Sequence, residues 1–112
     1  MTKCIIAGGR DFTNYDLLES EADKLAIVEV VSGLAKGADE LGFNYAVNNG
    51  IGIKEFPADW DKFGRGAGHI RNKQMGDYAD VLLAFWDGKS TGTANMIDYM
   101  NKLGKPVIIV GY

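Results

Sequence analysis

Short, nearly continuous apolar runs alternate along this chain with segments of helical periodicity. All but the third run are rich in Val, Ile or Leu, which is typical of strands covered on both faces of a parallel sheet. The third run carries charge and a glycine, which predicts an edge strand. The predicted strands are Lys3–Ala7, Ile27–Val31, Ile51–Phe56, Val81–Phe85 and Val107–Val110.

Between these runs, apolar residues recur at the spacing of a helix face. Thr13 stands three residues before Asp16, which predicts a capping box at the start of the first helix. Strand and helix in repeated succession require right-handed crossovers, so we expect a parallel sheet with helices on both faces. The predicted helices are Tyr15–Leu25, Lys36–Asn49, Ala67–Tyr78 and Gly92–Leu103.

With the third strand at an edge, the expected strand order is 3-2-1-4-5, that of a Rossmann-like α/β fold. We therefore predict a three-layer α/β/α sandwich built on a five-stranded parallel sheet. The 112 residues suit a single domain, 1–112. In this order the winding reverses between strands 1 and 4, and such folds bind ligands outside the carboxyl ends of the strands at that point.

Composition narrows the class of protein further. A hydrophobic fraction of 46% and a charged fraction of 24% are ordinary for a soluble protein. Cys4 is the single cysteine, so no intramolecular disulfide can form, and we expect a cytoplasmic location with no membrane partner. With one histidine, His69, we expect neither a metal site nor a cofactor. A net charge of −3 argues against nucleic-acid binding, which a basic surface normally mediates.

The 15 glycines are about twice the average frequency, and they gather after the predicted strands. After strand 1, Gly8 and Gly9 are expected to turn tightly and expose amide donors, and Arg10 adds a planar fork suited to phosphate. The alternative is a simple turn with a surface ion pair between Arg10 and Asp11.

Small residues after strand 2 open the second helix. Ser32 and Gly33 precede the helix and Lys36 begins it, and the amides of its first turn are expected to form an anion site. Asp39 either complements the helix dipole or accepts a ribose hydroxyl.

A Gly-Thr pair opens the last helix beside the point where the winding reverses. Trp86 follows strand 4 and precedes this pair. The amides of Gly92 and Thr93, with the hydroxyls of Ser90, Thr91 and Thr93, predict a phosphate cradle. The alternative is ordinary N-capping by Ser90 or Thr91.

The longest predicted loop runs from Pro57 to about Gly66. Trp60 and Phe63 stand there in a polar stretch, where they either stack on a base or cover a neighbouring helix. Arg65 in this loop and Arg71 in the following helix are further anion donors.

Five short motifs span nearly the whole chain: Gly8–Phe12, Ser32–Asp39, Ala58–Trp60, Gly64–Asn72 and Gly92–Ala94. In this order they resemble the YspA-like branch of the SLOG superfamily, whose small stand-alone members occur in bacteria and phages. The resemblance implies a Rossmann-like domain that binds nucleotides or ADP-ribose-like molecules at these loops. The superfamily also includes LOG-type phosphoribohydrolases, the DNA-processing protein DprA and ligand-sensing domains of antiviral effectors.

Two positions depart from these patterns. LOG enzymes carry a glutamate three residues after the Gly-Thr pair, where this chain has Met96, which cannot transfer a proton. The YspA-like pattern has proline where His69 stands, so the resemblance assigns His69 no role.

The leading hypothesis is therefore a binding module that senses or sequesters a nucleotide-derived small molecule. The alternatives are a hydrolase of an N-glycosidic bond, with Asp39 or Asp59 as general base, and single-stranded nucleic-acid binding. Related folds dimerise through helices, so we expect a homodimer, with Met96, Tyr99 and Met100 either in the core or at that interface. The predicted ligand-binding residues are Gly8, Gly9, Arg10, Asp11, Ser32, Gly33, Lys36, Asp39, Trp60, Arg65, Arg71, Asn72, Trp86, Ser90, Gly92 and Thr93.

Overall fold

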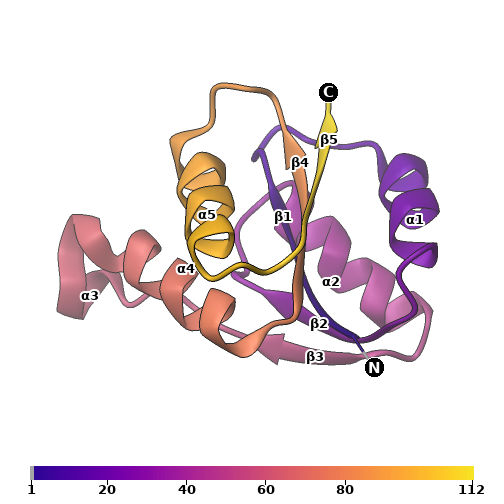
Figure 1. Cartoon of the computed structure of the whole chain (residues 1–112), viewed down its shortest axis with the longest axis horizontal. Helices are drawn as coiled ribbons and strands as arrows, with labels where there is room; N and C mark the ends of the chain where they lie inside the picture. Colours follow the sequence, from indigo (N-terminus) through magenta and orange to yellow (C-terminus); the bar gives the residue numbers. More distant parts are fainter. Residues whose placement is uncertain (1) are drawn as a thin grey trace.

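The sheet has the order β3-β2-β1-β4-β5 in the computed structural model, which describes residues 2–112. Every neighbouring pair of strands runs parallel. The predicted Rossmann-like architecture and its strand order are confirmed (Figure 1). The strands are β1 (Thr2–Gly8), β2 (Ile27–Ser32), β3 (Gly52–Glu55), β4 (Val81–Trp86) and β5 (Val107–Gly111).

Helices cover both faces of the sheet, as Figure 1 shows. Alternate residues of β1 point to opposite faces: Cys4 and Ile6 join the cluster under α1 and α2, whereas Ile5 and Ala7 join the cluster under α4 and α5. Burial of both sets explains why this strand reads as a continuous apolar run. The helices are α1 (Tyr15–Asp23), α2 (Ala38–Asn48), α3 (Trp60–Phe63), α4 (Ala67–Tyr78) and α5 (Thr91–Lys102), with a 3₁₀ turn at Gly64–Gly66.

Two helix starts differ from the prediction. The first helix is capped by Asn14, whose side-chain oxygen accepts from the Leu17 amide at 3.1 Å, so the predicted capping box at Thr13 is wrong. The second helix begins at Ala38 instead of Lys36, because Gly37 adopts a left-handed backbone (φ +77°) that a helix cannot continue through.

The predicted loop after β3 contains a helix. Asp59 accepts from the Lys62 amide at 3.1 Å and so caps α3, a single turn at Trp60–Phe63 that is followed by the 3₁₀ turn. This segment extends away from the body of the molecule in Figure 1. Trp60 and Phe63 stay largely exposed there, although the Trp60 ring lies close to Gly68 at the start of α4.

The sequence left open whether three side chains near the end of the chain pack in the core or at an interface between copies. Met96 and Met100 are buried against the sheet and are unavailable to an interface between copies. Tyr99 is half-buried, and its hydroxyl donates to Asp77 at 2.6 Å. Cys4 is fully buried, and burial raises the pKa of its thiol to about 12. No helix within the described residues is long and apolar enough to cross a membrane.

Lys105, in the loop between α5 and β5, forms hydrogen bonds with the C-terminal end of α4. Its ammonium donates to the carbonyl oxygens of Gly76 and Ala79, each at 2.8 Å. A cation at a helix C-terminus satisfies terminal carbonyls and complements the helix dipole. This contact helps to fix α4, whose first turns border the site described next.

Candidate functional site

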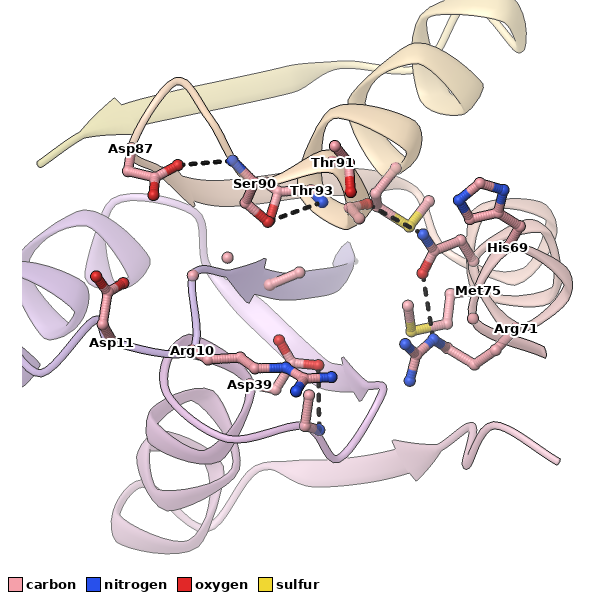
Figure 2. Close-up of a pocket in the computed structure, with 18 of the residues that line it drawn as sticks. Arg10, Asp11, Asp39, His69, Arg71, Met75, Asp87, Ser90, Thr91 and Thr93 are labelled. Atoms are coloured by element: carbon pink, nitrogen blue, oxygen red, sulfur yellow. Dashed lines mark hydrogen bonds between the residues drawn. The ribbon is translucent and has the colours of Figure 1, made fainter. Parts of the chain in front are cut away.

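A cavity of about 560 Å³ opens at the carboxyl ends of β1 and β4, where the winding of the sheet reverses (Figure 2). Loops from four parts of the chain contribute to its walls, and the first turns of α4 and α5 close two of its sides. Most of the predicted ligand-binding residues line it: Gly8, Gly9, Arg10, Asp11, Asp39, Trp60, Arg65, Arg71, Asn72, Ser90, Gly92 and Thr93.

The loop between β1 and α1 forms one wall. The amide of Gly9 donates to the Phe85 carbonyl at 3.0 Å. The prediction that this amide is a free donor is therefore wrong. Its own carbonyl accepts from the amide of Ala38 at 3.2 Å, which holds this loop against the start of α2. The amides of Arg10 and Asp11 come next in the chain, and no acceptor for either is found among residues 2–112. The free amide donors of this loop therefore belong to the two residues that follow Gly9.

The loop between β4 and α5 forms the opposite wall. Asp87 accepts from the amides of Lys89 and Ser90, each at 2.8 Å, and these bonds lower the pKa of its carboxyl. Ser90 then caps α5 by accepting from the amide of Thr93 at 3.5 Å. The amides of Thr91 and Gly92 have no acceptor within the described chain, as expected for the first turn of a helix. Both residues line the cavity, so two unbonded amides and the positive end of the helix dipole lie at its wall.

Arg71 and Asn72 on α4 link the two sides of the cavity. Arg71 donates from Nη1 to the Gly33 carbonyl at 2.6 Å and from Nε to Oδ1 of Asn72 at 3.2 Å. Asn72 in turn donates from Nδ2 to the Gly92 carbonyl at 3.2 Å and to Oδ1 of Asn95 at 2.9 Å. Much of their bonding capacity is thus used within the protein, so both residues position the β2–α2 and β4–α5 loops. Burial, with Arg10 as a further contributor, lowers the pKa of Arg71.

Asp39 forms part of the cavity floor, at the start of α2. Its side chain is 5% exposed, and Oδ2 accepts from the amide of Ala35 at 3.4 Å. Burial raises the pKa of this carboxyl to about 6, against the opposing effect of nearby Arg71. Asp39 is therefore ionised at neutral pH and protonated in mild acid.

Some predicted residues lie elsewhere. Ser32 is buried and accepts from the amide of Leu34 at 3.1 Å, and with Lys36 it lines a smaller hollow of about 140 Å³. Gly33 lies under Arg71, where an added Cβ would stand 2.5 Å from Nη1. The Trp86 indole donates to the Ser90 carbonyl at 3.1 Å and does not line the cavity. Asp59 caps α3 outside the cavity, which removes it as a general base there.

Other lining residues were missed. Gly68, His69 and Met75 of α4 reach the cavity, and so does Asp87. Thr91, predicted as part of the phosphate cradle, also lines it. On α4 the helical spacing from Gly68 through Asn72 to Met75 places these residues near one face, which is a signal that the sequence contains. No group of three or more metal-ligating side chains is found in residues 2–112.

Comparison with known proteins fixes the family. A sequence model of the YspA, cpYpsA-related SLOG family matches residues 2–63, more than half of the chain. The chain belongs to this family. Gene 61 protein of Mycobacterium phage D29 is 35% identical over 122 aligned residues, covering 99% of this chain and 98% of the phage protein. Membership in the SLOG family supports a role related to nucleotides or nucleic acids.

The fold also matches a solved SLOG-type structure. DNA processing protein A (DprA) from Streptococcus pneumoniae superposes with a TM-score of 0.78 at 15% sequence identity. The match covers 96% of this chain and 49% of DprA, so this chain spans about half the length of that protein. At this identity the likeness shows a shared fold.

Proposed function

We propose that this protein binds a nucleotide-derived small molecule, such as a nucleotide or an ADP-ribose-like compound. Its phosphate lies between the β1–α1 loop and the β4–α5 loop. One observation carries this proposal. The amides of Arg10, Asp11, Thr91 and Gly92 have no acceptor in the described chain, and all four residues line one cavity. Unsatisfied amides at a helix N-terminus, such as those of Thr91 and Gly92, and in a tight loop form a ready site for an anion.

Charge and size support the same ligand class. Arg10 and Arg65 are exposed at the cavity, and no hydrogen bond to their side chains is found within residues 2–112, so both guanidinium groups are available to a phosphate. A volume of about 560 Å³ lies within the range of small-molecule sites, roughly 300–1,000 Å³. Arg10, Arg65 and Arg71 face three lining carboxylates, those of Asp11, Asp39 and Asp87, so the phosphate is expected at the free amides and the two unbonded arginines.

Trp60 supplies an apolar surface at the cavity mouth. Its side chain is 55% exposed, although it lines the cavity. The indole lies near Gly68, because a Cβ added at that glycine would stand 3.5 Å from Cη2 of the ring. An exposed ring of this kind at a polar cavity is suited to stacking on a base.

Binding is tested by isothermal titration calorimetry at pH 7.5 with ADP-ribose and a panel of nucleoside 5′-phosphates. Removing a charge-assisted phosphate contact costs about 2 kcal/mol, so Arg10→Ala is expected to weaken binding by more than tenfold. Lys73→Ala is the matched control, because Lys73 is an exposed cation of α4 that does not line the cavity. Failure of every compound to bind, or equal losses in both variants, would overturn the proposal.

Release of the natural ligand gives an independent test. Protein purified under mild conditions is denatured, and the released small molecules are identified by mass spectrometry. A stoichiometric nucleotide derivative that native protein then leaves intact is the expected result. Conversion to a free base and a ribose phosphate would instead favour the hydrolase alternative. Binding is the better supported function, because Met96 lines the cavity where LOG-type enzymes place their glutamate.

A further inference from the structure

Asp39 is a buried carboxylate without a paired cation. Its side chain is 5% exposed, and no Lys, Arg or His nitrogen in the described residues lies within 4.0 Å of it. Leaving a buried charge unpaired is costly, and buried carboxylates in proteins are normally paired or fully hydrogen-bonded. Groups that keep such a cost while facing a cavity are candidates for binding a ligand.

Arg71, the cation whose charge acts on the Asp39 carboxyl, is held away from pairing with it. Its Nη1 donates to the Gly33 carbonyl at 2.6 Å, and its Nε donates to Asn72. The carboxylate accepts one long hydrogen bond, 3.4 Å from the amide of Ala35, and the backbone amides of Gly8 and of Asp39 itself add weaker stabilisation of its charged form. A carboxylate offers about four acceptor positions, so Asp39 retains capacity for donors that a ligand brings.

The position of Asp39 indicates which part of a ligand meets it. The Asp39 backbone adjoins Ala38, whose amide donates to the Gly9 carbonyl at 3.2 Å, so Asp39 lies beside the loop that presents the free Arg10 and Asp11 amides. In a nucleoside 5′-phosphate a single methylene group separates the phosphate from the sugar ring. A phosphate bound at the Arg10 and Asp11 amides therefore places the sugar next to Asp39. The carboxylate repels the phosphate itself but accepts from sugar hydroxyls.

Resting on the proposed function, we infer that Asp39 accepts hydrogen bonds from the 2′- and 3′-hydroxyls of a ribose, so that the cavity selects ribonucleotides over 2′-deoxyribonucleotides. Two neighbouring hydroxyls match the two oxygens of one carboxylate. Both hydroxyls are donors, and hydrogen bonds to a charged acceptor are the stronger kind. The energetic cost of burying Asp39 unpaired is offset when the ribose binds.

The test is calorimetric titration of the unmodified protein at pH 7.5 with matched pairs of ligands. Each of the four ribonucleoside 5′-monophosphates is compared with its 2′-deoxy counterpart, and AMP also with 3′-deoxy-AMP. Loss of one hydroxyl bonded to a carboxylate is expected to weaken binding at least tenfold. Equal affinities within the pairs would overturn this inference while leaving the proposed function standing. If no member of the panel binds, both fall.

A variant then assigns the selectivity to Asp39. Asp39→Asn keeps the shape of the side chain but removes its charge, and it is expected to bring the ribose preference below about threefold. Glu40→Gln makes the same change at the next residue, which is exposed and does not line the cavity, and should keep the full preference. A ribose preference that persists in Asp39→Asn would overturn the role of this residue. The comparison of ligand pairs on the unmodified protein stays decisive if the variant fails to fold.

Discussion

Neutralising Asp39 should stabilise the unliganded protein at neutral pH. Burial raises the pKa of this carboxyl from its ordinary value of 3.8 to about 6. That rise of about 2, at 1.36 kcal/mol for each pKa unit, corresponds to about 3 kcal/mol by which the ionised side chain destabilises the fold. Asp39→Asn removes the charge and keeps a side-chain oxygen that can accept from the amide of Ala35. We therefore expect the variant to be about 3 kcal/mol more stable at pH 7.5.

The gain should depend on pH with a definite sign. Because the folded-state pKa of Asp39 lies above the unfolded value, the folded protein binds more protons between about pH 4 and pH 6. The stability of the unmodified protein therefore falls, relative to the variant, as pH rises through this window, and the difference is constant above about pH 7. At pH 4.5 the advantage of Asp39→Asn should shrink to about 1 kcal/mol.

Urea unfolding followed by circular dichroism measures both quantities at pH 7.5 and pH 4.5. Glu40→Gln serves as the control, because an exposed carboxylate is expected to change the free energy of unfolding by less than about 0.5 kcal/mol. Two results would refute the reasoning: Asp39→Asn less stable than the unmodified protein at pH 7.5, or a gain that is the same at both pH values. If Asp39→Asn both gains stability and loses the ribose preference, then Asp39 serves ligand binding at a cost to the stability of the fold.

Three further substitutions test other parts of the structure. Gly37→Ala forces a side chain into a left-handed backbone and places its Cβ 2.2 Å from the Gly9 carbonyl oxygen, so thermal unfolding should show a loss of about 3 kcal/mol. Gly33→Ala places a Cβ 2.5 Å from Nη1 of Arg71, a movable side chain, so calorimetry should show weakened nucleotide binding while circular dichroism shows a retained fold. Lys105→Met keeps the apolar stem but removes the donor to the last carbonyls of α4, so urea unfolding should show a loss of about 2 kcal/mol.

The layered fold could be predicted because its signals are local. A strand that is buried on both faces reads as a continuous apolar run, and the edge strand reads as a charged one. Both signals lie among neighbouring residues, and together they predicted the strand order 3-2-1-4-5 that the structure shows. The α3 turn was missed because four residues are too few to show periodicity. The signal for this turn was its capping residue, Asp59, for which the only predicted role was that of a general base.

The site was predicted less completely, because its details depend on contacts between distant parts of the chain. The grouping of strand-end loops follows from the topology alone. The Gly9 amide, however, is occupied by the carbonyl of Phe85, and Arg71 donates to the carbonyl of Gly33, 38 residues away. Neither pairing has a signature in local sequence. The sequence predicted Arg71 as a ligand donor, and the structure adds that it positions two loops while lining the cavity.

The most direct test of nucleotide binding is an amide chemical-shift titration of ¹⁵N-labelled protein with the tightest-binding compound of the calorimetric panel, or with ADP-ribose if none binds measurably. If the phosphate rests between the two loops, the largest shifts should fall on the amides of Arg10, Asp11, Thr91 and Gly92, which have no acceptor in the described chain. Amides of the α1 helix, which does not line the cavity, should stay unchanged. Saturating ligand that leaves these four amides unshifted, or that shifts residues away from the cavity instead, would contradict the account.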